Sequence, residues 1–264
     1  MTGERWIVEP VPALADPAVR LFCFAHAGGG PAFFRRWRAA LAPEIDVRPV
    51  LLPGRESRIR EAPARRIEQV LDPLCAALLP HLDRPYVLFG HSMGAVLAYE
   101  VGRRLARSRA SHMGFAEGPA AVLVSGRRAP RLPTNRRLFS TLPDAEFLRE
   151  IGGLGGTPPE VLQESALLRA LLPPLRADFE LNEWYQPLPG PRLHCPVAAY
   201  MGAADPEVNH RELLGWHEET GGEFTMRVFD GDHFYLKDGR ADVLAAVRQD
   251  VQRAAGQIQL CAVA

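Results

Sequence analysis

Long apolar runs are missing from this sequence. No stretch approaches the roughly 18 consecutive apolar residues that a membrane-spanning helix needs. Residues 1–6 also lack the apolar core of a secretory signal peptide. We therefore expect a cytoplasmic protein that is neither inserted into a membrane nor secreted.

Net charge is missing as well. The 264 residues include 31 Lys and Arg against 31 Asp and Glu, which gives a formal net charge of +0. Without an excess of basic side chains there is no global field to attract nucleic acid or an anionic membrane, and we expect neither as a partner.

Cysteine is scarce and follows no metal-ligand spacing. Cys23 and Cys195 fall in or beside strand-like runs, and Cys75 falls on a helix-like one. With no metal-ligand spacing among these three and Cys261, we expect free thiols in a reducing compartment. The sequence also lacks the pattern G-x-x-x-x-G-K-[ST] and a complete G-x-G-x-x-G fingerprint, so a phosphate cradle is not expected. We expect no metal and no cofactor.

Strand-like apolar segments alternate with helix-like segments along most of the chain. This alternation predicts an α/β fold with a mainly parallel sheet flanked by helices. The expected strands are 6–10, 19–25, 45–52, 86–89, 120–125, 196–201 and 224–229. The expected helices are 32–41, 67–82, 93–107, 142–151, 158–172, 173–185, 208–220 and 238–255.

Residues 131–191 interrupt this alternation because they contain no strand-like run. We expect one domain over 1–264, with a core of 1–130 and 192–264 and a helical insertion at about 131–191. A helical block between two sheet strands predicts a lid, and the glycines of 152–156 favour a mobile one. A helical decoration without a gating role is the alternative.

The strand at 86–89 runs directly into Gly90-His91-Ser92-Met93-Gly94. A G-x-S-x-G pattern between strand and helix is typical of a nucleophile elbow, in which the serine Oγ stands exposed at the end of the sheet. Ser92 is therefore the candidate nucleophile, and the N–H of Met93 is a candidate donor to an oxyanion. The alternative is a tight turn that carries a serine by chance.

A candidate acid and base follow later strands. Asp205 and His233 come after Ser92 in the chain order of α/β-hydrolases, each just past the end of an expected strand. His233 would take the serine proton, and Asp205 would orient its ring. Asp230 and Asp232 flank the histidine, but neighbours in sequence are poorly placed to hold the ring from behind.

A glycine-rich loop, His26-Ala27-Gly28-Gly29, follows the strand expected beside the elbow strand. Esterases place such a loop there to supply a second backbone N–H to the oxyanion. Ala27 is therefore the second candidate donor. A tight glycine turn without this role is the alternative.

Five motifs occur in order along the chain, at 24–29, 52–56, 89–95, 175–178 and 231–234. Together they resemble the type II (external, editing) thioesterases of nonribosomal peptide and polyketide synthesis, over residues 20–251. The resemblance implies an α/β-hydrolase fold with a helical lid. It also implies hydrolysis of acyl or aminoacyl thioesters on the 4′-phosphopantetheine arm of carrier proteins, which clears mis-primed or stalled modules. Acyl or peptidyl carrier protein domains would be the partners of a monomeric enzyme.

The resemblance assigns the triad to Ser92, Asp205 and His233, and the oxyanion donors to Ala27 and Met93. Aromatic residues late in the insertion or beside the base are candidates to contact the acyl group: Phe179, Trp184, Tyr185 and Phe234. Packing of the lid on the core is the alternative for most of them.

A basic stretch is a candidate surface for an acidic carrier protein or its phosphate: Arg55, Arg58, Arg60, Arg65 and Arg66. A solvated face is the alternative. For the whole protein, a carboxylesterase or lipase acting on oxygen esters, an acyltransferase and a non-catalytic carrier-binding accessory are the other hypotheses. The late acid–base pair and the helical block favour a hydrolase.

Overall fold

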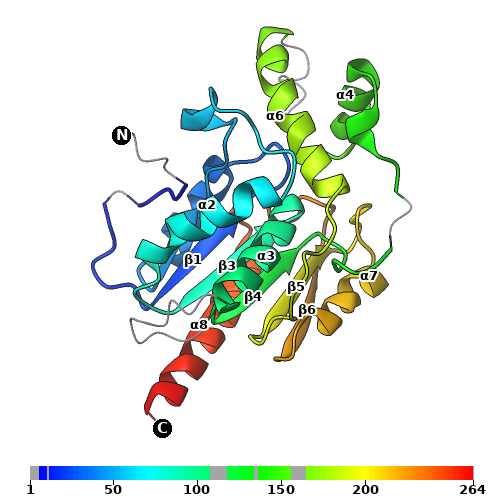
Figure 1. The fold of residues 1–264 in the computed structure, drawn as a ribbon. Helices are drawn as coiled ribbons and strands as arrows, with labels where there is room; N and C mark the ends of the chain where they lie inside the picture. The colour runs from blue at the N-terminus through cyan, green and yellow to red at the C-terminus, as the bar shows by residue number, and fades with distance from the viewer. Residues whose placement is uncertain (1–5, 11, 108–117, 134–135, 156–164, 264) are drawn as a thin grey trace.

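The computed structural model describes residues 6–10, 12–107, 118–133, 136–155 and 165–263. Six strands form one parallel sheet in the order β2-β1-β3-β4-β5-β6 (Figure 1). They are β1 (Val19–Phe24), β2 (Ile45–Pro49), β3 (Tyr86–His91), β4 (Ala121–Ser125), β5 (Val197–Gly202) and β6 (Phe224–Phe229). Every residue of β1 to β5 is buried, as parallel strands covered on both faces require. The predicted parallel sheet is confirmed.

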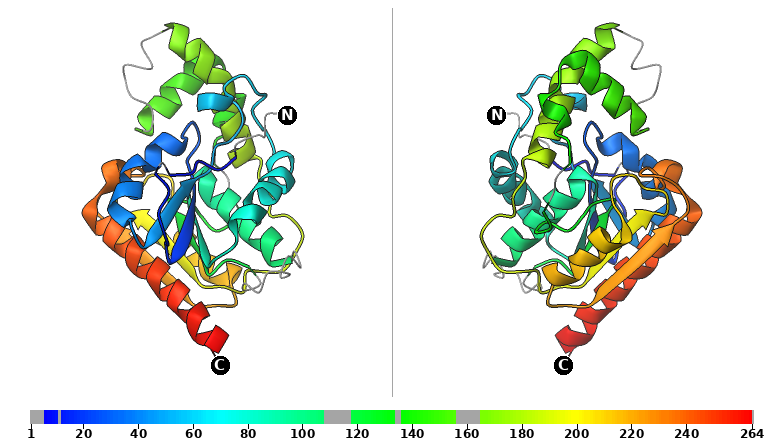
Figure 2. Two further views of the ribbon diagram at one scale, coloured as in Figure 1. Left: turned by 90° about the vertical axis from the view of Figure 1, so that its left-hand side faces the viewer. Right: turned by 90° about the vertical axis from the view of Figure 1, so that its right-hand side faces the viewer.

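Helices cover both faces of this sheet (Figures 1 and 2). One face carries α2 (Glu68–Leu78), α3 (Met93–Arg107) and α7 (His210–Leu214), and the other carries α1 (Arg35–Leu41) and α8 (Ala241–Val263). Each face has its own hydrophobic core, one around Tyr99 and Trp216 and the other around Trp37 and Phe89. Short 3₁₀ helices complete the fold: η1 (Pro31–Phe34), η2 (Glu56–Arg58), η3 (Leu79–His81), η6 (Gly215–Glu219) and η7 (Lys237–Gly239).

A helical insertion follows β4. It contains η5 (Phe139–Thr141), α4 (Asp144–Gly153) and α6 (Ser165–Glu183), which stand together beyond one end of the sheet (Figures 1 and 2). Side-chain contacts tie α6 to the loops that follow β1 and β4. The insertion therefore lies at the carboxyl ends of the strands, where parallel α/β sheets place their sites.

The prediction of two helices at 158–172 and 173–185 is wrong. In the described part there is one helix, α6, which continues through Pro173 and Pro174. Proline normally kinks or ends a helix because it lacks an N–H and clashes with the preceding turn. Beyond the prolines, Ala177, Asp178 and Leu181 are buried, and this tertiary packing outweighs the local preference. Residues 158–164 lie outside the described residues.

Two smaller predictions also differ. In the described residues 6–10 there is an isolated antiparallel bridge between Ile7 and Val50 rather than a strand. The helix predicted at 208–220 is divided into α7 and η6, and Gly215, a poor helix former, stands at the junction. Residues 108–117, between the helix predicted at 93–107 and the strand predicted at 120–125, lie outside the described residues.

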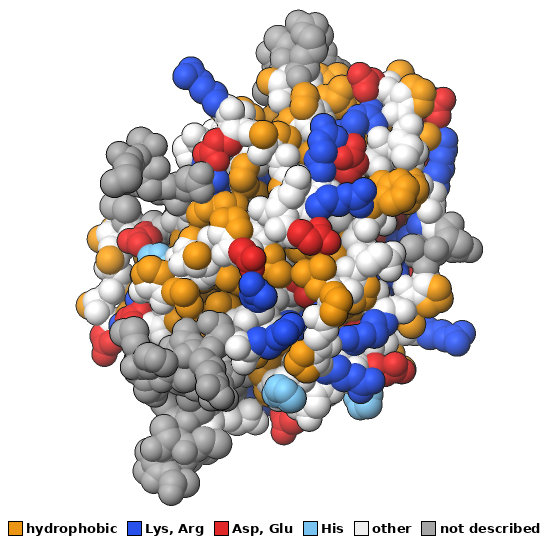
Figure 3. Space-filling view, viewed as in Figure 1, with side chains coloured by type: hydrophobic (Ala, Val, Ile, Leu, Met, Phe, Trp, Pro, Cys, Tyr) orange, Lys and Arg blue, Asp and Glu red, His pale blue; other side chains and the backbone are white. Residues whose placement is uncertain are grey.

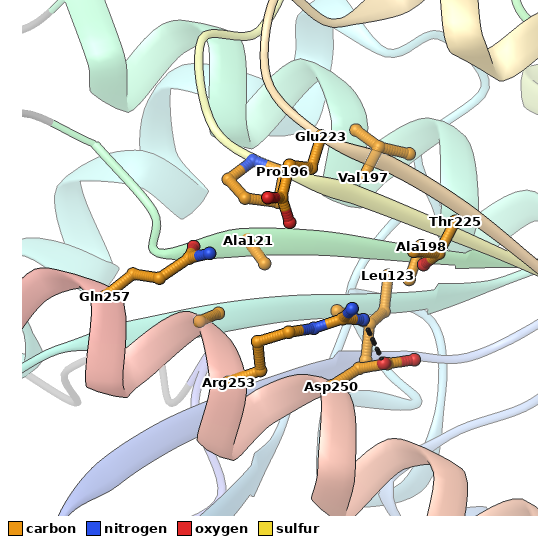
Figure 4. Close-up of a pocket in the computed structure, with 11 residues that line it drawn as sticks. Ala121, Leu123, Pro196, Val197, Ala198, Glu223, Thr225, Asp250, Arg253 and Gln257 are labelled. Atoms are coloured by element: carbon orange, nitrogen blue, oxygen red, sulfur yellow. Dashed lines mark hydrogen bonds and ion pairs between the residues drawn. The ribbon is translucent and has the colours of Figure 1, made fainter.

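A small cavity lies near the amino ends of β4, β5 and β6, under α8 (Figure 4). The ion pair between Asp250 and Arg253 lies beside it. Its volume of about 20 Å³ is enough for about one water molecule. This cavity is therefore too small for an acyl substrate.

On the face seen in Figure 3, Asp and Glu side chains are scattered among those of Lys and Arg, most of which lie toward the centre and right of the view. This agrees with the balanced composition. Among the described helices, none combines the length and the apolar composition that crossing a membrane would require.

Candidate active site

The order of the strands brings two loops together. The chain passes from β1 to β2 on one side and then returns to place β3 on the other side of β1. Phe24, the last residue of β1, is in register with Gly90 of β3. The loop at 26–30 and the elbow around Ser92 therefore flank the switch point of the sheet, where ligands bind in open α/β folds.

The elbow is a tight turn that only glycines can flank. Ser92 has a φ of +55°, a left-handed conformation that costs a residue with a Cβ about 1–3 kcal/mol. A Cβ added at Gly90 would lie 2.0 Å from the Gly94 carbonyl oxygen, and one added at Gly94 would lie 2.1 Å from the Phe24 carbonyl oxygen. Met93 begins α3, so its N–H has no partner within the helix.

The histidine–carboxylate pair comes from two other strand ends. His233 follows β6 and Asp205 follows β5, and the Nδ1 of His233 lies 2.9 and 3.0 Å from the two carboxylate oxygens of Asp205. Both side chains are buried. A carboxylate only accepts hydrogen bonds, so Nδ1 must carry the proton and Nε2 is left as an acceptor. By contrast, Asp232 accepts the N–H of Phe234.

His91 packs against the candidate base. The structure places its ring 4.8 Å from that of His233, centroid to centroid. Its Nδ1 lies 2.9 Å from Ser125 Oγ, which in turn lies 2.6 Å from the Tyr235 hydroxyl. Burial and the neighbouring histidines lower the pKa of His91 well below its ordinary value. A neutral ring therefore supports His233.

Gly126 makes this packing possible. It follows β4 with a φ of +60°, and a Cβ there would lie 2.7 Å from the ring of His91 and 3.0 Å from that of His233. Sequence reasoning did not single out Gly126 or Ser125 as part of the site. The signal in the sequence is that Ser125 ends the strand next to the elbow strand and Gly126 directly follows it.

The glycine-rich loop is a hydrogen-bonded turn. The N–H of Gly29 donates to the carbonyl of His26 at 2.9 Å, and Gly28 in between has a φ of +78°. Positive φ at this place is typical of a type II turn. The His26 carbonyl points toward the N–H of Gly29. In a trans peptide the carbonyl and the N–H point in opposite directions, so the N–H of Ala27 points away from the Gly29 N–H.

A buried ion pair forms hydrogen bonds to the backbone of this turn. Asp178 of α6 accepts the Gly28 N–H at 2.7 Å and binds Arg55 through two further bonds of 2.8 and 2.6 Å. Arg55 also donates to the carbonyl of Gly29 at 2.8 Å. The motifs at 52–56 and 175–178 contain these two residues, but nothing in the sequence indicates that they touch. We call Arg55, Asp178 and the bonds to Gly28 and Gly29 the turn clamp.

His26 contacts two rings, those of His91 and Phe234, that in turn contact the candidate base. Its ring packs edge-on against those of Phe33, Phe234 and His91, and its Nδ1 is buried without a hydrogen-bond partner among the described residues. Desolvation, together with the charges of His233 and Arg55, lowers the pKa of His26 to about 3. The ring is therefore neutral at physiological pH.

The candidate acyl-contacting residues fall into different environments. The Tyr185 hydroxyl donates to Glu100 at 2.5 Å, and its ring is buried in the core beside α3. Phe179 packs against Phe139 and Phe147 within the insertion. Trp184 is 46% exposed, with Arg66 over its ring, while Phe234 contacts the ring of His233. Of the four, Phe234 lies in contact with the candidate base.

The basic stretch is not one continuous surface. Arg55 is buried in the turn clamp, and Arg58 is buried between Glu61 and the ring of Trp6. Arg65 pairs with Glu180 at 2.6 Å. A surface that meets a partner can include at most the remaining, exposed part of the stretch.

Other chemistry is limited in the part of the chain that has been placed. Among those residues, no group of three or more His, Cys, Asp or Glu side chains is positioned to hold a metal ion. Cys23 and Cys75 are buried free thiols, and burial raises the pKa of Cys75 to about 12. Such thiols are poor nucleophiles.

The parallel sheet, the serine elbow at its switch point and the insertion after β4 define an enzyme of the α/β-hydrolase fold. Comparison with known proteins narrows this class. The thioesterase-domain family matches residues 19–251. The chain belongs to this thioesterase family, and it is a hydrolase of the type II kind found in nonribosomal peptide and polyketide pathways.

Similar proteins come from such pathways. The type II thioesterase BorB of the borrelidin biosynthetic cluster is 38% identical, with a TM-score of 0.81 over 93% of this chain and 97% of that one. Thioesterase PikA5 of Streptomyces venezuelae is 38% identical over 88% of this chain and 80% of that protein. Linear gramicidin dehydrogenase LgrE of Brevibacillus parabrevis is 37% identical over 96% of this chain and 94% of that protein. The present sequence has no complete G-x-G-x-x-G fingerprint of the kind that many dinucleotide-binding dehydrogenases carry.

Proposed function

We propose that this protein hydrolyses acyl or aminoacyl thioesters carried on the 4′-phosphopantetheine arm of carrier proteins, and so clears mis-primed or stalled synthase modules. Ser92 is the nucleophile, His233 the general base and Asp205 the residue that orients it. Backbone N–H groups of Ala27 and Met93 stabilise the oxyanion. The enzyme acts as a cytoplasmic monomer and needs no cofactor of its own.

The first half-reaction follows from the tautomer of His233. With Nδ1–H held by Asp205 at 2.9 Å, Nε2 is free to take the Ser92 hydroxyl proton as Oγ attacks the thioester carbon. The C–S bond then breaks, and the imidazolium returns the proton to the leaving sulfur. A thiol has a pKa of about 8.5, so its thiolate is a good leaving group.

The second half-reaction uses the same groups. Water attacks the carbonyl carbon of the acyl-serine ester, and His233 takes the proton from that water. The proton passes to Ser92 Oγ as the ester bond breaks, which releases the carboxylic acid. Each oxyanion donor is worth about 10²–10³ in rate, so the position of the Ala27 turn matters in both steps.

The observation that carries the proposal is the contact between His233 Nδ1 and Asp205, two residues that follow neighbouring strands. The pathway membership of the relatives supports carrier-bound thioesters as substrates. Oxygen esters are the second candidate substrate, because the same groups would cleave them.

The test is intact-mass analysis of acyl-loaded carrier proteins, with and without enzyme. We expect loss of the acyl group with wild-type protein and a fall of at least about 10³-fold in rate with Ser92→Ala. Ser57→Ala, at an exposed serine in η2, is the matched control and should retain activity. Undiminished hydrolysis by Ser92→Ala would overturn the assignment of the nucleophile. A strong preference for p-nitrophenyl esters over carrier thioesters would overturn the substrate class.

A further inference from the structure

A cavity of about 330 Å³ lies beside the candidate acid. Four segments form its wall: the loop after β4, the start of the insertion around η5, the end of α6, and the loop after β5 at Pro206 and Glu207. Pro206 directly follows Asp205. The cavity therefore borders the catalytic edge of the sheet and is partly roofed by the insertion.

Four arginines line this cavity, and the outer two are neutralised. Arg136 pairs with Glu207 and Glu212 at 3.1 and 3.0 Å. Arg137 pairs with Glu146 and Glu150 of α4 at 3.2 and 2.8 Å. Their charges are thus matched by carboxylates of the protein itself.

The inner two arginines are not neutralised in this way. Arg127 donates to the backbone carbonyl of Asn182 at 3.1 Å, and Arg128 donates to that of Leu132. Within the described residues neither guanidinium forms an ion pair with a carboxylate. Glu183, which also lines the cavity, is occupied by the N–H groups of Phe139 and Ser140 and by the Ser140 hydroxyl.

Each guanidinium of the inner pair has more N–H donors than the one hydrogen bond described above uses. A guanidinium carries five N–H donors. In the described residues, each nitrogen of Arg127 and Arg128 either has a hydrogen-bond partner or retains some solvent exposure. Arg128 is nevertheless only 7% exposed. Burial and the charge of Arg128 lower the pKa of Arg127 to about 10, which reflects two adjacent cations held away from bulk water.

We propose that this cavity is a subsite for an oxyanion, a phosphate or carboxylate group, carried by the substrate and held by Arg127 and Arg128. Guanidinium groups bind such oxyanions through paired, charge-assisted hydrogen bonds. The rings of Phe139 and Phe179 and the side chain of Leu138 supply an apolar wall, which suits an anion attached to an organic chain rather than a free inorganic ion.

This inference rests on the proposed function, which offers two sources of the anion. One is the phosphodiester of the phosphopantetheine arm. The other is a free carboxylate on a dicarboxylic acyl group. Both are recognised by the same chemistry, so an experiment with separate arms must distinguish them.

The first arm measures binding without turnover. In the Ser92→Ala background, 4′-phosphopantetheine and pantetheine are titrated by calorimetry. A phosphate source predicts that phosphopantetheine binds at least about tenfold more tightly, because each charge-assisted hydrogen bond is worth that much or more. The difference should shrink as salt is raised.

The second arm measures turnover by the wild-type enzyme. Succinyl-pantetheine is compared with butyryl-pantetheine, which has the same chain length and no carboxylate. A carboxylate source predicts a kcat/KM at least about tenfold higher for the succinyl thioester. Hydrolysis of the butyryl thioester tests the proposed thioesterase activity by itself, so failure of the subsite and failure of the function are separable.

Substitutions of the arginines that line the cavity then test whether either preference arises there. Arg127→Gln and Arg128→Gln should each remove most of the preference for the anionic ligand and leave butyryl-pantetheine turnover within about twofold. Arg137 lines the same cavity but is paired with Glu146 and Glu150. The variant Arg137→Gln should therefore keep the preference for the anionic ligand. If Arg128→Gln fails to fold, Arg127→Gln and the salt titration of the wild-type protein still test the proposed subsite. Absence of both preferences, or a preference that survives both inner substitutions, overturns the proposal.

Discussion

Arg55 holds both carboxylate oxygens of Asp178, across 123 positions of sequence, with N–O distances of 2.8 and 2.6 Å. The same carboxylate accepts the N–H of Gly28 at 2.7 Å. The pair therefore joins α6 to the turn that carries the N–H of Ala27. Because both side chains are buried, water does not compete with these bonds, and the position of the turn depends on them.

Replacing Asp178 by Asn should lower kcat for thioester hydrolysis about ten- to a hundredfold with little change in KM. The amide keeps the shape but weakens the bond to Gly28, so the Ala27 donor is less well placed, and one such donor is worth about 10²–10³ in rate. Breaking a buried pair also costs about 3–5 kcal/mol of stability. Kinetics are therefore measured well below the unfolding midpoint, which a thermal scan provides.

The matched control is Glu180→Gln, on the same helix. Its ion pair with Arg65 is exposed, and such pairs contribute about 0–1 kcal/mol. This variant should keep kcat. Equal losses in the two variants, or a loss confined to KM for Asp178→Asn, would contradict a role in positioning the turn.

Gly28→Ala should destabilise the fold through two separable effects. The φ of +78° costs a residue with a Cβ about 1–2 kcal/mol, and the new Cβ would lie 2.7 Å from Leu175 Cδ1. Urea unfolding should show a smaller penalty in a Leu175→Ala background, with a coupling energy of at least about 0.5 kcal/mol. Gly153→Ala, where a Cβ meets nothing within 4 Å, should not be destabilising. Strict additivity of the two changes would exclude the steric contact.

Asp205→Asn should reduce kcat about 10⁴-fold, since the amide favours the wrong tautomer of His233. Asp232→Asn changes the adjacent carboxylate, which accepts a backbone N–H instead of meeting the ring. Its kcat should fall less than tenfold. Single-turnover release of the acyl group measures both. If Asp232→Asn is the more damaging change, the acid has been misassigned.

Acid should weaken the fold through His26. Its folded pKa of about 3 lies below the unfolded value of 6.5, so between these pH values the unfolded chain binds more protons. This contribution to stability is present in full above pH 6.5 and is lost as pH falls toward 3, by at most about 1.4 kcal/mol per pH unit. His26→Phe should flatten the decline in unfolding free energy between pH 7 and 5. An unchanged slope would show that His26 is not the group that titrates.

Much of this architecture is predictable from local sequence patterns. Buried parallel strands appear as continuous apolar runs, and the backbone approaches at Gly90 and Gly94 leave no choice of residue. The order of Ser92, Asp205 and His233 along the chain, each after a strand, also indicates the edge of the sheet at which the His233–Asp205 pair forms.

The remaining features depend on contacts between distant segments. A basic stretch looks the same in sequence whether its arginines face water or, as Arg55 does, a buried carboxylate 123 positions away. Prolines 173 and 174 predict a break, because the packing of Asp178 and Leu181 that keeps α6 continuous is tertiary. Similarly, the lack of a carboxylate partner for Arg127 among the described residues is visible only once the neighbouring segments have been placed.

If the insertion opens as a lid, the attachment of α6 to the turn couples that opening to the assembly of the proposed oxyanion hole. Any displacement of α6 that carries Asp178 away must also release Gly28 and leave Arg55 without its partner. An open enzyme would then be a poor catalyst while its Ser92 remained intact. By thermodynamic reciprocity, formation of a tetrahedral adduct on Ser92 would stabilise the position of α6 in which Asp178 binds Gly28, by the same free energy.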